Sequence, residues 1–333
     1  MKRRDFIKLS AGLGATMATT TPLSPAFAQT KMVLKAADVH PLGYPTVEAV
    51  LAMGKKLETA TNGRLTIQMF PSMQLGGEKE MIEQAQLGAL QIARISVGAV
   101  GPVVDDVNVF NMPFVFRNSK HMEKVIDGEI GDELLNKIST NEKTNLIALC
   151  WMNAGSRNVY NNKRPIRTMA DLKGLKVRMM GNPLFVDTMN ALGGNGVALG
   201  FDQVFSSMQT GVVDGAENNA PSFMAQNHYQ VAKYFTMTEH LIIPELVVFS
   251  RISWQKLSPE DQALIKKLSK EMQQEQRVLW YAAENAAIEK MKAAGTEIIT
   301  DIDKKPFQDA VKPVWDKYGA KYAAMVKRIE AVN

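Results

Sequence analysis

The 333-residue sequence has few of the side chains that build metal and redox sites. It holds one cysteine, Cys150, which excludes an internal disulfide and any metal site made of several cysteines. Its four histidines are scattered, and the sequence contains no CxxC, HExxH, GxSxG or Walker motif. We therefore expect no metal centre and no cofactor. Cys150 lies in the apolar run NLIALCW, which predicts a small buried side chain.

One glycine-rich segment imitates a dinucleotide-binding fingerprint. It is GGNGVALG, in which Gly194, Gly196 and Gly200 are spaced like the glycines of that motif. The fingerprint requires a strand before the glycines and a helix after them. Here a helical pattern precedes them and a strand pattern follows, so we interpret these glycines as a helix end and a turn.

Long hydrophobic runs are also missing. No stretch has the roughly 20 apolar residues that cross a bilayer. The N-terminus, MKRRDFIKLSAGLGATMATTTPLSPAFA, instead reads as an export signal of residues 1–28 with a small-residue cleavage site at its end. Arg3 and Arg4, followed by Asp5 and Phe6, resemble the twin-arginine motif, and an ordinary secretory signal is the alternative. We expect a periplasmic mature chain that begins near Gln29.

The sequence has no strong excess of one charge once this signal is removed. The whole chain carries 39 basic and 34 acidic residues, a net charge of +5. The signal holds four of the basic residues and one acidic residue, which leaves 35 against 33, or +2. Because no stripe of Lys and Arg with interleaved aromatics remains either, we expect no nucleic-acid partner.

The order of apolar patterns indicates an α/β protein in two parts. Strand-like runs MVLKAADV, RLTIQMF and NLIALCWM alternate with helical patterns over the first half. After residue 153 the alternation starts again, and LKVRMM, VALG and the helices between them indicate a second α/β lobe. Ser258 and Pro259 then begin a helical pattern that continues to Gly295. A helix of this length predicts a spine across both lobes, and a dimeric coiled coil is the alternative.

Arg178 is the side chain that first points to a ligand. It lies in LKGLKVRMMGNP, between the apolar residues Val177 and Met179, near the end of a predicted buried strand. Asn182 and Pro183 then suit the start of a helix, whose free N–H groups would share the same spot. Because an unpaired buried guanidinium is very unfavourable, an anion is expected there. From these residues alone it is either a protein carboxylate or a bound carboxylate or phosphate.

The order of motifs resembles one family over nearly the whole mature chain. FPSMQLGGEKEMIEQAQLGALQI is followed by SRNVYNNKRPIRTMADLKGLKVRMMGNP and then by ALGGNGVALGFDQVFSSMQTGVVDGAENN. This order is similar to that of the DctP-type periplasmic solute-binding subunits of tripartite ATP-independent periplasmic (TRAP) transporters. The resemblance implies a two-lobed periplasmic binding protein fold, with a long helix spanning both lobes. It implies lobe I at residues 30–154 and 244–283, and lobe II at residues 155–243 and 284–333.

The resemblance also implies a set of ligand-binding residues. The arginine that binds the ligand carboxylate corresponds to Arg178, and a second arginine corresponds to Arg157. Asn218 of DGAENN and the aromatic Phe201 match further positions. His40, Glu78 and Arg94 are the polar candidates from the first lobe, where family members vary, and Arg94 is alternatively a surface charge. Glu217 is expected either to meet ligand hydroxyls or to orient one of the two arginines.

These side chains suit one carboxylate and several hydroxyls. Two arginines with Asn218 provide charge-assisted bonds of about 1.5 to 3 kcal/mol each. A second carboxylate would be repelled by Glu78 or Glu217. The opening ADVHPLGYPTVEAV, with Arg94, resembles the branch that binds hexuronates such as D-glucuronate or D-galacturonate. A C4-dicarboxylate or another organic acid is the alternative ligand.

The expected activity is capture and delivery rather than catalysis. The ligand would be enclosed between the lobes and passed by a monomer to the small and large integral membrane TRAP subunits. The competing class is a periplasmic enzyme acting on sugar acids, for which Glu78 and Glu217 are the candidate pair of carboxylates.

Overall fold

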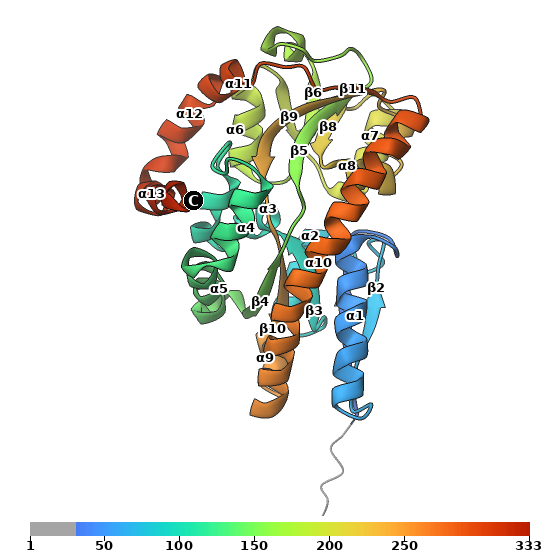
Figure 1. Ribbon diagram of the computed structural model, residues 1–333, viewed down its shortest axis with the longest axis vertical. Coiled ribbons are helices and arrows are strands. Elements are labelled where there is room, and N and C mark those ends of the chain that lie inside the picture. Colours follow the sequence, from blue (N-terminus) through green and yellow to red (C-terminus); the bar gives the residue numbers. More distant parts are fainter. Residues whose placement is uncertain (1–30) are drawn as a thin grey trace, which may run out of the picture. The chain divides into compact units, whose positions relative to one another are not determined.

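The computed structural model describes residues 31–333, so the predicted export signal lies outside the described residues. This part of the chain contains two β-sheets and the helices that cover them (Figure 1). No helix within it is both long and apolar enough to cross a membrane. The two sheets and their covering helices confirm the predicted mixed α/β class.

The first sheet has five strands in the order β2-β1-β3-β10-β4. β1 pairs in parallel with β2 and β3, whereas β10 is antiparallel to both β3 and β4. The strands are β1 (Met32–Ala37), β2 (Leu65–Phe70), β3 (Ile92–Ser96), β4 (Leu146–Met152) and β10 (Glu245–Ser250). The helices of this part are α1 (Pro45–Ala60), α2 (Glu78–Gln86), α3 (Val97–Val100), α4 (Ser119–Asp127), α5 (Glu129–Thr140) and α9 (Arg251–Trp254).

The second sheet has six strands in the order β11-β9-β5-β8-β6-β7. β5 is antiparallel to its neighbours β8 and β9, and β6 is parallel to β7 and β8. The strands are β5 (Ser156–Asn161), β6 (Lys176–Met179), β7 (Asn195–Ala198), β8 (Gly215–Asn218), β9 (Tyr234–Ile242) and β11 (Glu297–Ile299). Three helices follow its strands: α6 (Pro183–Ala191), α7 (Val204–Gln209) and α8 (Ala220–Ala225). Between α6 and β7, Gly193 has φ +94°, as the predicted helix end and turn requires.

The chain crosses between the sheets at two short segments and along one long helix. β4 leads into β5 through residues 153–155, and β9 leads into β10 through residues 243–244. α10 (Pro259–Ala293) begins as predicted, because the Ser258 side chain accepts from the Asp261 N–H. The helix packs on α1 and β4 of the first sheet and on α8 and β11 of the second (Figure 1). It is therefore the predicted spine.

Two glutamines of α10 hold the first crossing segment. Gln273 accepts a hydrogen bond from the Trp151 N–H at 3.1 Å. Gln276 accepts from the Asn153 N–H at 2.9 Å and donates to the Asn153 carbonyl at 2.8 Å. The Gln276 amide thus makes the hydrogen bonds that a neighbouring strand would make if Asn153 were still within the sheet.

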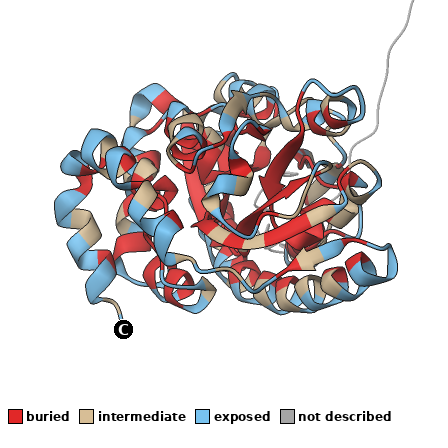
Figure 2. Cartoon of the chain, turned by 90° about the horizontal axis from the view of Figure 1, so that it is seen from above, coloured by how far each residue is buried: buried red, intermediate tan, exposed pale blue. Residues whose placement is uncertain are grey.

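The central strands of each sheet, such as β10, are buried on both faces, while the edge strands β2 and β7 are partly exposed, and Figure 2 shows the buried strands inside and the exposed outer helix faces. Alternation along β4 sends Trp151 into the core under α5, while Cys150 and Met152 face the core under α1 and α10. Cys150 is fully buried as predicted, and this burial raises the pKa of its thiol to about 12.

The C-terminal helices cover one side of the molecule and touch both parts. They are α11 (Lys305–Ala310), α12 (Lys312–Val314) and α13 (Ala323–Ala331). α12 packs on α6, while α13 packs on α5 (Figure 1). The His121 ring lies 2.9 Å from the Ile329 carbonyl, and Arg328 forms an ion pair with Glu133. The last thirty residues therefore tie the second half of the chain to the first.

Candidate functional site

A cavity lined mainly by polar residues lies where the two sheets meet. It lies at the carboxyl ends of β1, β3, β6 and β8 and at the amino ends of β5 and β10. These ends coincide because antiparallel strands place their amino ends at the edge where parallel neighbours finish. The lining residues are Val39, His40, Glu78, Arg94, Ser96, Arg157, Arg178, Met180, Phe201, Asn218, Asn219, Ser222 and Glu245. The structure thus gathers seven of the eight predicted residues around one cavity, and Glu217 lies outside it.

Arg178 is buried, with 3% of its surface exposed, and reaches the cavity from β6. Its Nε donates to the Leu199 carbonyl at 2.8 Å. Within residues 31–333 its two terminal nitrogens make no hydrogen bond and no ion pair. Its guanidinium lies 5.7 Å from the centre of the Phe201 ring. The anion expected beside Arg178 is therefore not a carboxylate from the described part of the chain.

One local expectation about Arg178 is wrong. Asn182 caps α6 by accepting from the Leu184 N–H at 3.1 Å, as the sequence indicates. Its amide, however, donates to the Gly98 carbonyl at 3.3 Å, and residues 181–185 do not line the cavity. The start of α6 packs against the first part of the chain, so its N–H groups are not at the guanidinium.

Arg157 is held in place by its neighbour strand. Its Nε and Nη2 donate to the two carboxylate oxygens of Glu217 at 2.5 and 2.8 Å, and its Nη1 donates to the Asn218 side chain at 3.0 Å. Glu217 has no exposed surface. The geometry therefore favours the second of its two expected roles, in which it orients Arg157 from behind the cavity wall. Arg157, in turn, helps to lower the pKa of Arg178, although burial is the larger cause.

Arg94 is the centre of a buried cluster on the first sheet. It is 1% exposed, which excludes the alternative of a surface charge. Its Nη1 donates to Glu78 at 3.0 Å and to Glu245 at 2.6 Å, and its Nη2 donates to Asp38. One guanidinium thus contacts three carboxylates, so the net charge of these four side chains is −2 if all are ionised. On the opposite side, Arg157, Arg178 and Glu217 together have a net charge of +1.

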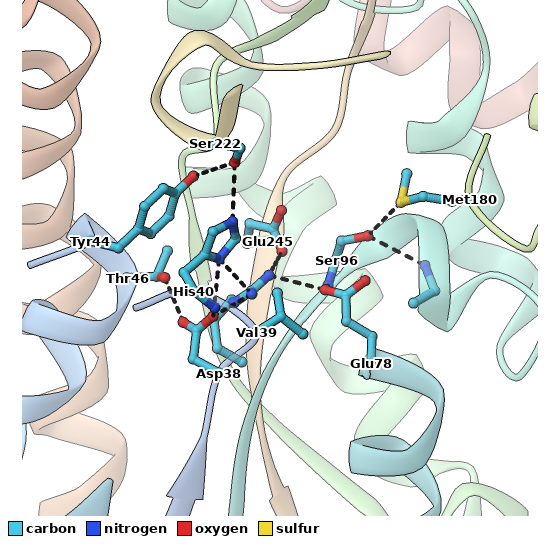
Figure 3. Close-up of polar contacts among 12 residues, drawn as sticks. Asp38, Val39, His40, Tyr44, Thr46, Glu78, Ser96, Met180, Ser222 and Glu245 are labelled. Atoms are coloured by element: carbon cyan, nitrogen blue, oxygen red, sulfur yellow. Dashed lines mark hydrogen bonds and ion pairs between the residues drawn. The ribbon is translucent and has the colours of Figure 1, made fainter. Parts of the chain in front are cut away.

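His40 connects the two walls. Its Nδ1 lies 3.0 Å from Asp38 and its Nε2 lies 3.0 Å from the hydroxyl of Ser222 at the start of α8. The imidazole stacks on the Tyr44 ring at 3.7 Å, and the Tyr44 hydroxyl lies 2.8 Å from the same serine oxygen (Figure 3). Burial and the charge of Arg94 lower the pKa of His40, so the ring is neutral at neutral pH.

Sequence reasoning missed six polar residues of this region: Asp38, Tyr44, Ser96, Asn219, Ser222 and Glu245. Asp38 and Tyr44 flank His40 in the loop that follows β1, so their nearness to it was a usable signal. Glu245 opens the apolar run ELVVFS, where a carboxylate is out of place unless it has a partner. Asn219 and Ser222 gave no comparable signal, because capping residues occur at most helix starts.

A family model described as "Bacterial extracellular solute-binding protein, family 7" (DctP) matches residues 36–321. The chain belongs to the DctP family. Within that family it resembles the crystal structure of a TRAP periplasmic solute-binding protein from Pseudomonas putida F1 with bound D-glucuronate. The two chains are 59% identical with a TM-score of 0.89, over 91% of this chain and 98% of that one. A TRAP periplasmic solute-binding protein from Xanthobacter autotrophicus Py2 with bound β-D-galacturonate is 40% identical, with a TM-score of 0.86, over 90% and 100% of the chains.

A third DctP-family relative, from Citrobacter koseri, has two structures that differ in state. The form with bound D-glucuronate matches this chain with a TM-score of 0.89 at 47% identity, over 91% and 100% of the chains. The apo, open form gives 0.79 at 45% identity, over 90% and 98%. Because the identities are nearly equal, the difference reflects shape. The two sheets of this chain are therefore arranged more like the ligand-bound form, in agreement with the contact between His40 and Ser222.

Proposed function

We propose that this DctP-family protein captures a hexuronate such as D-glucuronate or D-galacturonate in the periplasm and delivers it to the membrane subunits of a TRAP transporter. The observation that carries the proposal is Arg178. Its terminal nitrogens face the cavity without a carboxylate partner in residues 31–333, whereas Arg94 and Arg157 both have one. A ligand carboxylate completes the ion pair that Arg178 lacks.

The opposite wall supports a ligand with hydroxyls. Glu78 and Glu245 present carboxylate oxygens there, which accept hydrogen bonds from hydroxyls. The neutral ring of His40 lines the cavity, but its two nitrogens are engaged with Asp38 and Ser222. Asn218 and Arg157 donate to ring or hydroxyl oxygens. Phe201 offers an apolar face beside Arg178. The relatives with bound glucuronate and galacturonate agree with this chemistry, because each ligand has one carboxylate and several hydroxyls.

Capture would proceed by closure of two lobes. We assign lobe I to residues 30–154 and 244–283 and lobe II to residues 155–243 and 284–333. Two of the three boundaries coincide with the short crossings between the sheets, which are the natural hinges, and the third falls within α10. The C-terminal helices contact both lobes, so they would move with α6 and slide against α5.

The remaining parts of the proposal concern location and partners. The N-terminal sequence would direct export through the twin-arginine route, and the mature protein would act as a monomer. The closed, ligand-bound form would be the one that the small and large membrane subunits recognise.

A hydrolytic or isomerising enzyme is less well supported by the site. The candidate carboxylates Glu78 and Glu217 each form an ion pair with an arginine, and Glu217 does not line the cavity. A general acid and base would need to reach the ligand from the cavity wall.

The test is ligand binding by the exported protein, unfolded and refolded to remove any ligand carried through purification. Calorimetric titration should show saturable binding of D-glucuronate or D-galacturonate and no binding of D-glucose, which lacks the carboxylate. A ligand at 100 times its dissociation constant should also raise the free energy of unfolding by about 2.7 kcal/mol. Binding of succinate without binding of either uronate would contradict the proposal, as would turnover of a bound uronate.

A further inference from the structure

Glu245 is a buried carboxylate with one oxygen turned toward the cavity. It is the first residue of β10, opposite Ser96 on β3 and Met152 on β4, and 6% of its surface is exposed. Its Oε2 accepts from Arg94 at 2.6 Å. Its Oε1 has no hydrogen-bond partner within residues 31–333, although the residue lines the cavity. Figure 3 shows this second oxygen pointing away from the contact with the arginine.

The other two carboxylates of the Arg94 cluster are better compensated. Asp38 accepts from the Thr46 hydroxyl at 2.6 Å and from the His40 N–H at 2.9 Å, in addition to Arg94. Glu78 accepts from the Ser96 N–H at 2.8 Å as well as from Arg94, both at its Oε1, so its Oε2 is also without a hydrogen-bond partner within residues 31–333. Glu245 accepts one hydrogen bond, from Arg94, the fewest of the three carboxylates. Glu245 and Glu78 thus both have hydrogen-bonding capacity left for a ligand, and Glu245 is the one held by a single contact.

The charges that face Glu245 come from four directions. Arg94 on β3 and, farther away, Arg157 on β5 are positive, while Glu78 on α2 and Asp38 after β1 are negative. Burial raises the pKa of Glu245 to about 7, with a contribution from Glu78, while Arg94 opposes the shift. This carboxyl group therefore changes its charge near neutral pH.

We propose that Glu245 is a specificity-determining residue, which lets this end of the cavity accept a ligand hydroxyl and reject a second carboxylate. The inference rests on the proposed capture of a uronate. A hydroxyl donates to Oε1 of the ionised carboxylate or accepts from the protonated form. A second ligand carboxylate cannot donate, and it meets the charges of Glu245 and Glu78 with Arg94 already shared among three anions.

This inference also adds a source of the repulsion. The sequence assigned it to Glu78 or Glu217; Glu78 lines the cavity beside Glu245, whereas Glu217 is paired with Arg157 and does not line the cavity. The class of compound that Glu245 excludes is the aldaric acids, which resemble uronic acids but carry a carboxylate at both ends. D-Glucarate is the matched probe for D-glucuronate, because the two share a hydroxyl pattern.

The experiment measures the affinity ratio of D-glucuronate to D-glucarate for the refolded mature protein at about pH 5.5 and about pH 8.5, a range in which both sugar acids stay ionised. The variants are Glu245→Gln and, as a control, Glu123→Gln. Glu123 is a buried glutamate with hydrogen bonds to Asn153 and Tyr281, and it does not line the cavity. In the native protein the ratio should favour D-glucuronate and should fall on acidification, as Glu245 takes up a proton.

Glu245→Gln should lower the ratio at the higher pH by about tenfold or more, the effect of removing one facing charge. It should also remove most of the pH dependence, while Glu123→Gln changes neither. If Glu245→Gln binds D-glucuronate and its affinity ratio of D-glucuronate to D-glucarate equals that of the native protein, the inference is overturned and the proposed function stands. If that variant does not fold, a pH-independent ratio in the native protein overturns the inference by itself. If the native protein binds no uronate at either pH, the proposed function fails and the inference falls with it.

Discussion

Two buried arginines in one cavity differ in what surrounds them. Arg94 has its charge shared among three carboxylates of its own chain, whereas Arg178 has a backbone carbonyl and an aromatic ring. Burial alone is unfavourable for either guanidinium, so each needs an anion. For Arg94 the anions are carboxylates of its own chain, and the arginine holds them together on one side of the cavity. For Arg178 we propose that the anion arrives with the ligand, which would make this residue the principal electrostatic anchor.

Replacement of Arg178 by lysine should separate binding from folding. Arg178→Lys keeps the charge but loses the planar fork that binds a carboxylate in two places. We expect uronate binding to weaken by about 2 to 5 kcal/mol, the range for a broken buried charge pair, with little change in the melting temperature of the unliganded protein. Calorimetry and thermal unfolding on the same preparation measure the two quantities.

The matched control is Arg64→Lys, because Arg64 forms an ion pair with Asp261 away from the cavity. This variant should bind uronate like the native protein. A large loss of stability in unliganded Arg178→Lys, with affinity nearly intact, would show that Arg178 supports the fold rather than the ligand.

At the scale of elements, local signals were sufficient where a segment carries its own pattern. The apolar run before Asn153 predicted β4, and Ser258 with Pro259 predicted the first residue of α10. The position of β10 between β3 and β4 could not be predicted, because its partners lie about a hundred or more residues away and no local pattern encodes such pairing. The contact between Glu245 and Arg94 was missed for the same reason, since Glu245 reaches the cavity only through this pairing.

Gln276 of α10 makes both hydrogen bonds to the Asn153 backbone in the crossing between β4 and β5. Gln276→Leu fills a similar volume but leaves the Asn153 N–H and carbonyl without partners in a buried position. We expect a loss of about 2 to 5 kcal/mol in the free energy of unfolding, from two unsatisfied backbone groups. Gln274→Leu, on the exposed face of the same helix, should change it by less than about 0.5 kcal/mol. Urea unfolding of both variants measures the difference, and equal losses would show that the hydrogen bonds to Asn153 are not needed.

At the scale of the whole molecule, buried titratable groups act in opposite directions on stability. Burial lowers the pKa of His228 to about 3 and that of His240 to about 4, from 6.5. As pH falls below 6.5 the unfolded chain takes up these protons first, so the folded state loses stability. Glu245 acts in the other direction, because its pKa rises from 4.5 to about 7 on folding. As pH falls from 7 towards 4.5, its protonation favours the folded state.

The predicted result is a partly compensated pH profile. The native free energy of unfolding should fall between about pH 7.5 and pH 5, because the four histidines, whose pKa values are all lowered on folding, outweigh one glutamate. In Glu245→Gln this compensating contribution is absent, so the free energy of unfolding should fall by about 2 kcal/mol more over the same pH range. The figure follows from roughly 1.4 kcal/mol for each unit by which folding shifts a pKa. Urea unfolding at several pH values checks this, with Glu123→Gln as the control. Parallel profiles for the native protein and Glu245→Gln would mean that Glu245 titrates normally in the fold.

The burial of Cys150 has a practical consequence for observing lobe closure. With its thiol sealed in the first core and its pKa raised to about 12, almost none of it is the reactive thiolate in the folded protein. A cysteine introduced at an exposed site on each lobe would therefore be labelled by thiol-directed fluorophores without first removing the native one. The sequence thus supplies an effectively cysteine-free background, in which the distance between two dyes reports the opening and closing of the cavity.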